Sequence, residues 1–196
     1  MAERGRPRSF DRDAALRAAM RVFWRQGYQG ASIADLTQAM GIAPPSLYAA
    51  FGDKRALYLE ALGLYGETLG ARLWAVLDGA PSAREGVGAL FALSAAQLTR
   101  PDQPRYCMAV MADGDCDELR AETRSGRAGV QAMLQRRFER AAAEGELPPG
   151  VDVAALARFY ATIQQGLSIQ ARDGATETEL KAVARQALTA WPTKAQ

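Results

Sequence analysis

The sequence predicts an all-α protein with about nine helices. Apolar residues recur at every third or fourth position through most of the chain, with Ser, Thr or Asp caps before several of these runs and Gly or Pro after them. No segment shows the alternation of apolar and polar residues that is typical of a strand. With 196 residues, 48% of them hydrophobic, the chain can bury a sizeable core.

The first two helices are predicted from apolar spacing and from their ends. The first follows the N-terminal tail and is expected to stop at Gly27. The second is expected from Ser32 to Gly41. Ser32 and Asp35 have the spacing of a capping box, with Asp in place of Glu, and Gly41 can adopt the left-handed conformation that ends a helix.

The third helix is predicted to open at two adjacent prolines, Pro44 and Pro45, and to end at Gly52. The first N–H groups of a helix have no intrahelical partner, so proline loses little there and presets φ. Proline also disfavours α geometry in the residue before it, so the first turn starts at Pro44 or one residue later. Leu47 and Phe51 form the i, i+4 pair that faces the core.

The rest of the chain predicts six further helices, each bounded by caps or by glycine and proline breaks. Their expected ranges are 53–79, 82–101, 105–112, 117–144, 152–172 and 176–191.

Composition excludes several classes of function. The chain has two cysteines, Cys107 and Cys116, and no histidine, which argues against disulfide-stapled folds and zinc sites and leaves no His-based catalytic arrangement. We therefore expect no enzyme, no metal and no cofactor. No apolar run reaches the roughly 18 residues of a membrane span, and no signal segment is recognisable, so a cytoplasmic protein without a membrane partner is expected.

The positive charge is concentrated at the N-terminal end. Residues 1–60 carry nine Lys and Arg against six Asp and Glu, whereas the remainder has a net charge of −1. Such an asymmetry suits binding to a polyanion. Residues 32–51 have the size of a helix-turn-helix, although spacing alone fits ordinary helix packing about equally well.

The stretch GYQGASIADLTQAMGIAPPSLYAAFGDKRALYLEAL resembles the N-terminal signature of the TetR family of one-component bacterial regulators. The resemblance covers roughly residues 10–60. The residues that fall in register are Gly41, Leu47, Tyr48, Phe51, Lys54 and Leu57. It implies a DNA-binding domain at 1–52, a ligand-binding and dimerisation domain at 53–196, and a homodimer whose recognition helices enter successive major grooves of a palindromic DNA operator.

The resemblance implies that Ser32, Tyr48 and Lys54 contact DNA phosphates, and their hydroxyl, phenol and ammonium groups are suitable donors. The alternatives are a plain helix cap, a half-buried core aromatic and a solvated lysine.

Members of the family commonly carry longer polar residues at the positions of Pro44, Ala49 and Ala50. Base readout is therefore expected to depend on apolar contact of Pro44, Pro45 and Ala49 with thymine methyl groups, and on Ser46 as a hydrogen-bonding residue.

The N-terminal arm supplies a further candidate contact. Arg4, Arg6 and Arg8 lie in a segment that resembles the core of an AT-hook and could enter the minor groove over A·T pairs. The alternative is a tail that only improves solubility.

The second domain is expected to hold an apolar effector cavity, although for each candidate residue taken singly a place in the core is favoured. The candidates are Trp74, Phe91, Tyr106, Cys107, Met108, Met111, Met133, Phe159, Ile163 and Gln164. Cys107 and Cys116 could also react with electrophiles or oxidants, or be inert buried thiols. The last two helices carry small and apolar faces that suit a homodimer interface.

The leading interpretation is a dimeric transcriptional repressor that is released from its operator by a small-molecule or thiol-reactive effector. The alternative is a helical small-molecule-binding protein or enzyme whose N-terminal helices are structural.

Overall fold

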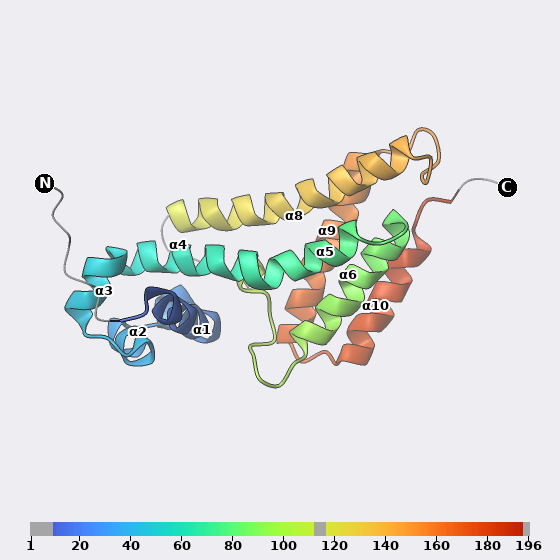
Figure 1. Ribbon diagram of the computed structural model, residues 1–196. Coiled ribbons are helices and arrows are strands. Elements are labelled where there is room, and N and C mark those ends of the chain that lie inside the picture. Colours follow the sequence, from blue (N-terminus) through green and yellow to red (C-terminus); the bar gives the residue numbers. More distant parts are fainter. Residues whose placement is uncertain (1–9, 112–116, 194–196) are drawn as a thin grey trace, which may run out of the picture.

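The computed structural model describes residues 10–111 and 117–193, and these form helices without any strand (Figure 1). The elements are α1 (Arg12–Gly30), α2 (Ile33–Met40), α3 (Pro44–Phe51), α4 (Lys54–Tyr65), η1 (Gly66–Gly70), α5 (Ala71–Asp78), α6 (Ala83–Leu98), α7 (Met108–Met111), α8 (Asp117–Ala143), α9 (Val153–Arg172) and α10 (Glu177–Thr189). Helix α4, the π-helical segment η1 and α5 follow one another without a break and form one continuous helix. Counted in this way, residues 10–111 and 117–193 contain nine separate helices. The predicted fold class is confirmed.

Local signals set the ends of the first helices. Gly27 has a positive φ of 72°, so regular α geometry in α1 stops there, as expected. Ser32 and Asp35 form the predicted capping box at the start of α2, and Gly41 ends that helix in the left-handed conformation, with φ 67°. The tight turn between α2 and α3 depends on this glycine, because other residues rarely adopt that backbone conformation.

Helix α3 begins at Pro44 itself, so the first of the two expected starts is the one observed. Ala43 occupies the N-cap and provides no side-chain hydrogen bond. The two prolines lack N–H groups, which leaves fewer backbone donors to be satisfied in this turn. Gly52, with φ 82°, ends the helix as predicted.

The apolar side chains form two cores. The N-terminal core joins α1, α2 and α3 to α4, with Leu36, Leu47 and Leu57 fully buried in it. The second core joins α5, α6, α8, α9 and α10 around Phe91, Phe138 and other apolar residues. Figure 1 shows α4, η1 and α5 as one long helix running from the N-terminal helices to the C-terminal bundle.

The change from one core to the other falls within this long helix. Tyr58, Ala61 and Tyr65 still belong to the N-terminal core, and Leu77 is the first buried residue of the second. The packing therefore does not change at residue 53, where the predicted second domain begins. A movement of α4 would be carried directly into the N-terminal core.

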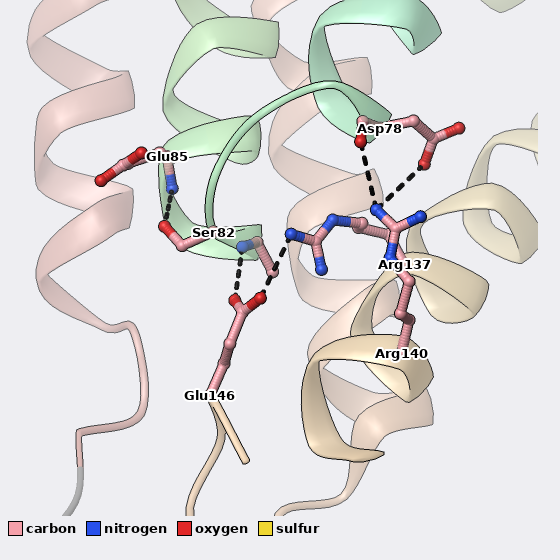
Figure 2. A network of polar contacts seen from close by, with 7 residues as sticks. Asp78, Ser82, Glu85, Arg137, Arg140 and Glu146 are labelled. Carbon is pink, nitrogen blue, oxygen red and sulfur yellow. Dashed lines mark hydrogen bonds and ion pairs between the residues drawn. The ribbon is translucent and has the colours of Figure 1, made fainter. Parts of the chain in front are cut away.

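A polar network fixes the far end of the second core, where the loop between α5 and α6 meets α8 (Figure 2). Ser82 caps α6 by accepting the Glu85 N–H (3.2 Å), and Glu146 accepts the Ala83 N–H (2.6 Å). The same Glu146 carboxylate pairs with the buried Arg137 (3.3 Å). A carboxylate from a distant loop therefore satisfies a donor of the first turn of α6.

Candidate nucleic-acid interface and effector cavity

The buried face of α3 fixes which of its residues face outward. Leu47 and Phe51 are buried in the N-terminal core, whereas Pro44, Pro45 and Tyr48 are exposed. Tyr48 is the most exposed large residue of the helix, at 48%. The predicted base-contacting and phosphate-contacting groups of α3 are thus accessible. Ala49 is also exposed and Ser46 is partly buried.

Ser32 already uses its hydroxyl within the protein. The hydroxyl donates to the Asp35 carboxylate (2.6 Å) and accepts the Asp35 N–H (3.0 Å). The hydrogen bond that the hydroxyl donates, followed by one from the Ser32 backbone N–H (3.0 Å), holds the pKa of the Asp35 carboxyl below its ordinary value. The helix-cap interpretation of Ser32 is therefore observed, and a phosphate would have to compete with the Asp35 carboxylate for the hydroxyl proton.

Lys54 lies at the start of α4, where its ammonium stands over the ring of Tyr28, 4.6 Å from the ring centroid. Partial burial lowers the pKa of Lys54. The aromatic ring attracts the cation and restricts the positions of a long side chain that would otherwise move freely. Tyr28 also packs against Tyr58 in the N-terminal core, so Lys54 is held by a fixed aromatic surface.

Arg12 orients α3, a role that no sequence pattern predicted. Its guanidinium pairs with the Glu60 carboxylate (2.7 Å), donates to the Ala50 carbonyl (3.4 Å), and lies 4.3 Å from the centre of the Phe51 ring. These contacts join the first residue of α1 to the last turn of α3 and to α4. Glu60 is 48 positions away in sequence, so no local pattern relates the two residues.

The three arginines of the N-terminal arm, Arg4, Arg6 and Arg8, lie outside the described residues. Within the described ranges there is no group of acidic, Cys or His side chains suited to a metal ion. None of the helices described is both long and apolar enough to cross a membrane.

A cavity of about 520 Å³ lies between the two cores and is bounded mainly by apolar atoms. Its wall includes residues from α1, from the long α4–η1–α5 helix, and from α6, α7, α8 and α9. This volume is typical of a site for a small organic molecule. Five of the predicted lining residues are present in the wall: Trp74, Tyr106, Cys107, Met133 and Gln164.

The structure places four other candidates away from the cavity wall. Phe91 is fully buried against Tyr160 in the second core, and Met108 is buried in the N-terminal core. Ile163 packs on the second core, and Phe159 is 40% exposed on the surface of α9. The side chain of Met111 is outside the described set, and so is Cys116. Helical spacing marks an apolar face but does not tell whether that face meets a cavity or another helix.

Cys107 and Tyr65 lie together in the cavity wall. The Cys107 N–H donates to the Ser168 hydroxyl (2.9 Å), which fixes the backbone beside the thiol. Burial, followed by the neighbouring Cys107 thiol, raises the pKa of Tyr65 well above its ordinary value. Tyr65 therefore remains a neutral phenol at physiological pH.

One wall of the cavity is bonded directly to α1. The Trp24 indole N–H donates to the Tyr106 carbonyl (2.8 Å), and the Tyr106 hydroxyl donates back to the Trp24 carbonyl. Both side chains line the cavity. A molecule in the cavity would consequently touch the N-terminal core through Trp24 and the long helix through Tyr65.

The exposed α3 beside α2, presented on a small helical core and joined to a second helical unit, defines a helix-turn-helix transcriptional regulator. Residues 15–61 match the family described as bacterial regulatory proteins, tetR family. Over 194 residues the chain is 37% identical to the HTH-type transcriptional repressor ComR of Escherichia coli (strain K12), and the match covers 96% of this chain and 92% of ComR. The chain belongs to the tetR family of bacterial regulatory proteins, and it is a regulator rather than an enzyme.

Solved structures show the same similarity. A cysteine-substituted form of the TetR family transcriptional regulator CifR, in complex with 26-bp double-strand operator DNA, is 47% identical, with a TM-score of 0.91. That match covers 96% of this chain and all of the CifR chain. The reduced form of E. coli NemR has a TM-score of 0.82 at 19% identity, which is a likeness of fold alone.

Proposed function

We propose that the chain is a transcriptional repressor that binds a palindromic operator as a homodimer and is released when an effector enters the cavity between the two cores. The observation that carries this proposal is the shared wall: Trp24 and Tyr65 belong to the N-terminal core and also line the cavity. A ligand that favours a different position of either residue would alter the presentation of α3. The relative ComR is named a repressor, and CifR was solved with operator DNA.

For the DNA contacts we retain the assignments made from the sequence. Ser32, Tyr48 and Lys54 would donate to phosphates, whereas Pro44, Pro45, Ala49 and Ser46 would meet base edges. The exposure of Pro44, Pro45 and Tyr48 supports this arrangement. The arm with Arg4, Arg6 and Arg8 would lie in the flanking minor groove.

The dimer is proposed to form through α9 and α10. Phe159, Ile169 and Val183 are exposed on these two helices at 40%, 45% and 44%. Large apolar side chains gathered on neighbouring helices favour burial against a second copy.

The effector is proposed to be a small organic molecule or a compound that reacts with a thiol. The apolar lining and the volume support the first, and the presence of Cys107 in the wall supports the second.

The proposal is tested by measuring, at increasing salt concentration, the affinity of the protein for the DNA upstream of its own gene. For a repressor that neutralises Z phosphates, the logarithm of the association constant falls with the logarithm of the salt concentration, with a slope of about −0.9Z. A shuffled DNA of the same length and composition is the control. Weak binding with a shallow slope, equal for both DNAs, would contradict the proposal.

A further inference from the structure

A row of three arginines on α1 has no role in the DNA contacts or in the effector cavity described above. Arg17, Arg21 and Arg25 are exposed and follow one another at intervals of four residues. They therefore share one helix face over about 12 Å. Like charges at this spacing repel each other and destabilise the helix, so the row lowers stability unless an anion neutralises it.

Among the described residues, few acidic side chains neutralise the positive charge of this row. The Arg17 charge contributes to a lowered pKa of Asp11, after the hydrogen bond from the Ala14 N–H. Asp102, which lies close to the row, is bonded instead to Arg100 through contacts of 2.6 and 2.9 Å. Arg21 and Arg25 have no ion pair with any described residue.

The row forms one rim of a groove of about 330 Å³ between the two parts of the molecule. The opposite side of the groove consists of the α4–η1 segment and of residues 102–104. The apolar residues of the groove are Met20 and Trp24 on α1 and Leu64, Leu69 and Pro104 on the opposite side. A groove with arginines along a rim and apolar groups beside them suits a molecule that has an anionic group and an apolar body.

We infer that this groove binds an organic anion, such as a carboxylate carried on an aromatic or aliphatic group. The groove adjoins the effector cavity and shares Trp24, Leu69 and Gln103 with it, but the arginine row lines the groove alone. The guanidinium groups of Arg21 and Arg25 hold the anionic group, and the apolar body lies against Trp24 and Leu69. The bound anion removes the repulsion within the row. It also contacts both α1 and the loop at 102–104, so it joins the N-terminal core to the second part of the molecule.

The test compares 4-phenylbenzoate with its neutral counterpart, 4-phenylbenzamide, by isothermal titration calorimetry on the full chain without DNA. We expect the carboxylate to bind at least fivefold more tightly than the amide, and this preference to shrink as salt is raised. Arg21→Gln should abolish the preference. Arg136→Gln, an exposed arginine on α8 outside the groove, is the matched control and should retain it.

Thermal unfolding separates binding from folding. Arg21→Gln removes two repulsive i, i+4 pairs, so its Tm should equal or slightly exceed that of the unmodified chain. Equal affinity for the two probes, no binding of either, a preference that survives Arg21→Gln, or one that disappears in Arg136→Gln would each overturn the inference.

Operator binding distinguishes this site from a DNA contact. Arg21→Gln should leave both the operator affinity and its salt slope unchanged. A lower affinity with a slope reduced by about 1 would assign the row to DNA phosphates and overturn the inference. Neither result depends on whether an effector releases the repressor.

Discussion

Lys54 occupies a position that helix electrostatics disfavour. It is the first residue of α4, where the positive end of the helix dipole repels a cation. The ring of Tyr28 offsets part of that repulsion by holding the ammonium over its face. A DNA phosphate would offset it further, because helix N-termini attract anions. The local cost of the lysine is thus consistent with a phosphate contact.

Tyr48→Phe and Lys54→Ala are expected to weaken binding to all DNA sequences by similar factors while the fold is retained. Lys54→Ala should also reduce the salt slope by about 1, because one phosphate contact is lost. Fluorescence anisotropy with operator and shuffled DNA measures both effects. Arg136→Ala, which removes an exposed cation on α8 outside the proposed DNA and dimer surfaces, is the control and should change neither. Unchanged affinity in both variants would refute the assigned contacts.

At the scale of the element, α3 has an unusual start. Its N-cap, Ala43, makes no side-chain hydrogen bond, so the two prolines define the first turn by their fixed φ angles and by their missing donors. Both rings are exposed beside Tyr48. A rigid apolar surface of this kind can contact thymine methyl groups with little loss of side-chain entropy.

Replacement of thymine by uracil at the contacted steps should weaken binding by about 1 kcal/mol per methyl group. Pro45→Ala should remove this sensitivity and keep the helix, since alanine is the better helix former. Titrations with substituted operators measure the effect, and uracil at positions outside the contacts is the control. If the prolines only start the helix, the uracil operators will bind as tightly as the thymine operators.

The π-helical segment η1 is the irregular point of the long helix. Gly66 lies in the cavity wall, and a Cβ atom added to it would meet no other atom within 4 Å. Its backbone is in the ordinary right-handed region, with φ −62°. Packing therefore does not require glycine at this position. The physical effect of Gly66 is therefore the conformational freedom that glycine gives the backbone. Its location is notable because π-helical turns are frequent at functional sites.

Gly66→Ala should accordingly raise the free energy of unfolding by about 0.4–1 kcal/mol and slow hydrogen exchange in η1. Chemical denaturation and hydrogen-exchange mass spectrometry measure these changes. Gly129→Ala on α8, where an added Cβ also meets nothing within 4 Å, is the matched control. It should stabilise the chain similarly and leave exchange in η1 unaltered. A destabilised Gly66→Ala variant would show that the π geometry itself needs glycine.

In the molecule as a whole, several connections join the two cores. They include the continuous helix from α4 to α5, the reciprocal bonds of Trp24 and Tyr106, the packing of α7 on α4, and helix α8, which places Leu119 in the N-terminal core and Leu134 in the second. Residues from each of these connections line the cavity. A ligand in the cavity would therefore contact the N-terminal core directly, at Trp24 and Tyr65.

Deletion of residues 1–8 should lower operator affinity and relax the preference for A·T pairs that flank the α3 contacts, because minor-groove arginines favour narrow A·T tracts. Selection of binding sites from random DNA, carried out with the full chain and with the truncated chain, measures both changes. Identical flanks in the two selections would show that the arm does not read DNA.

Val183→Glu should convert the dimer to a monomer and weaken operator binding, because a charge at a buried interface lacks a partner. Val183 is exposed within one chain, so the monomer should keep its fold. Sedimentation equilibrium measures the association. Ala128→Glu on α8 introduces the same charge at another exposed position and should remain dimeric. A Val183→Glu variant that is still dimeric would place the interface elsewhere.

The helices and the family can be inferred from local patterns in the sequence. Caps such as Ser32 with Asp35, the turn at Gly41 and the prolines at the start of α3 act within a few residues, so they can be recognised without knowledge of the fold. Gly41, Leu47, Tyr48, Phe51, Lys54 and Leu57 carry the resemblance to the TetR family, which is confirmed. The single long helix from 53 to 79 was also predicted, although its π-helical segment was not.

Contacts between distant residues, in contrast, become visible only in the folded chain. Arg12 reaches Glu60 across 48 positions, and Trp24 bonds Tyr106 across 82. Trp74 lines the cavity while Phe91, equally apolar in sequence, is enclosed by the core. Helical periodicity assigns a residue to a face, but the neighbour of that face is set by how distant helices pack, which no local pattern contains.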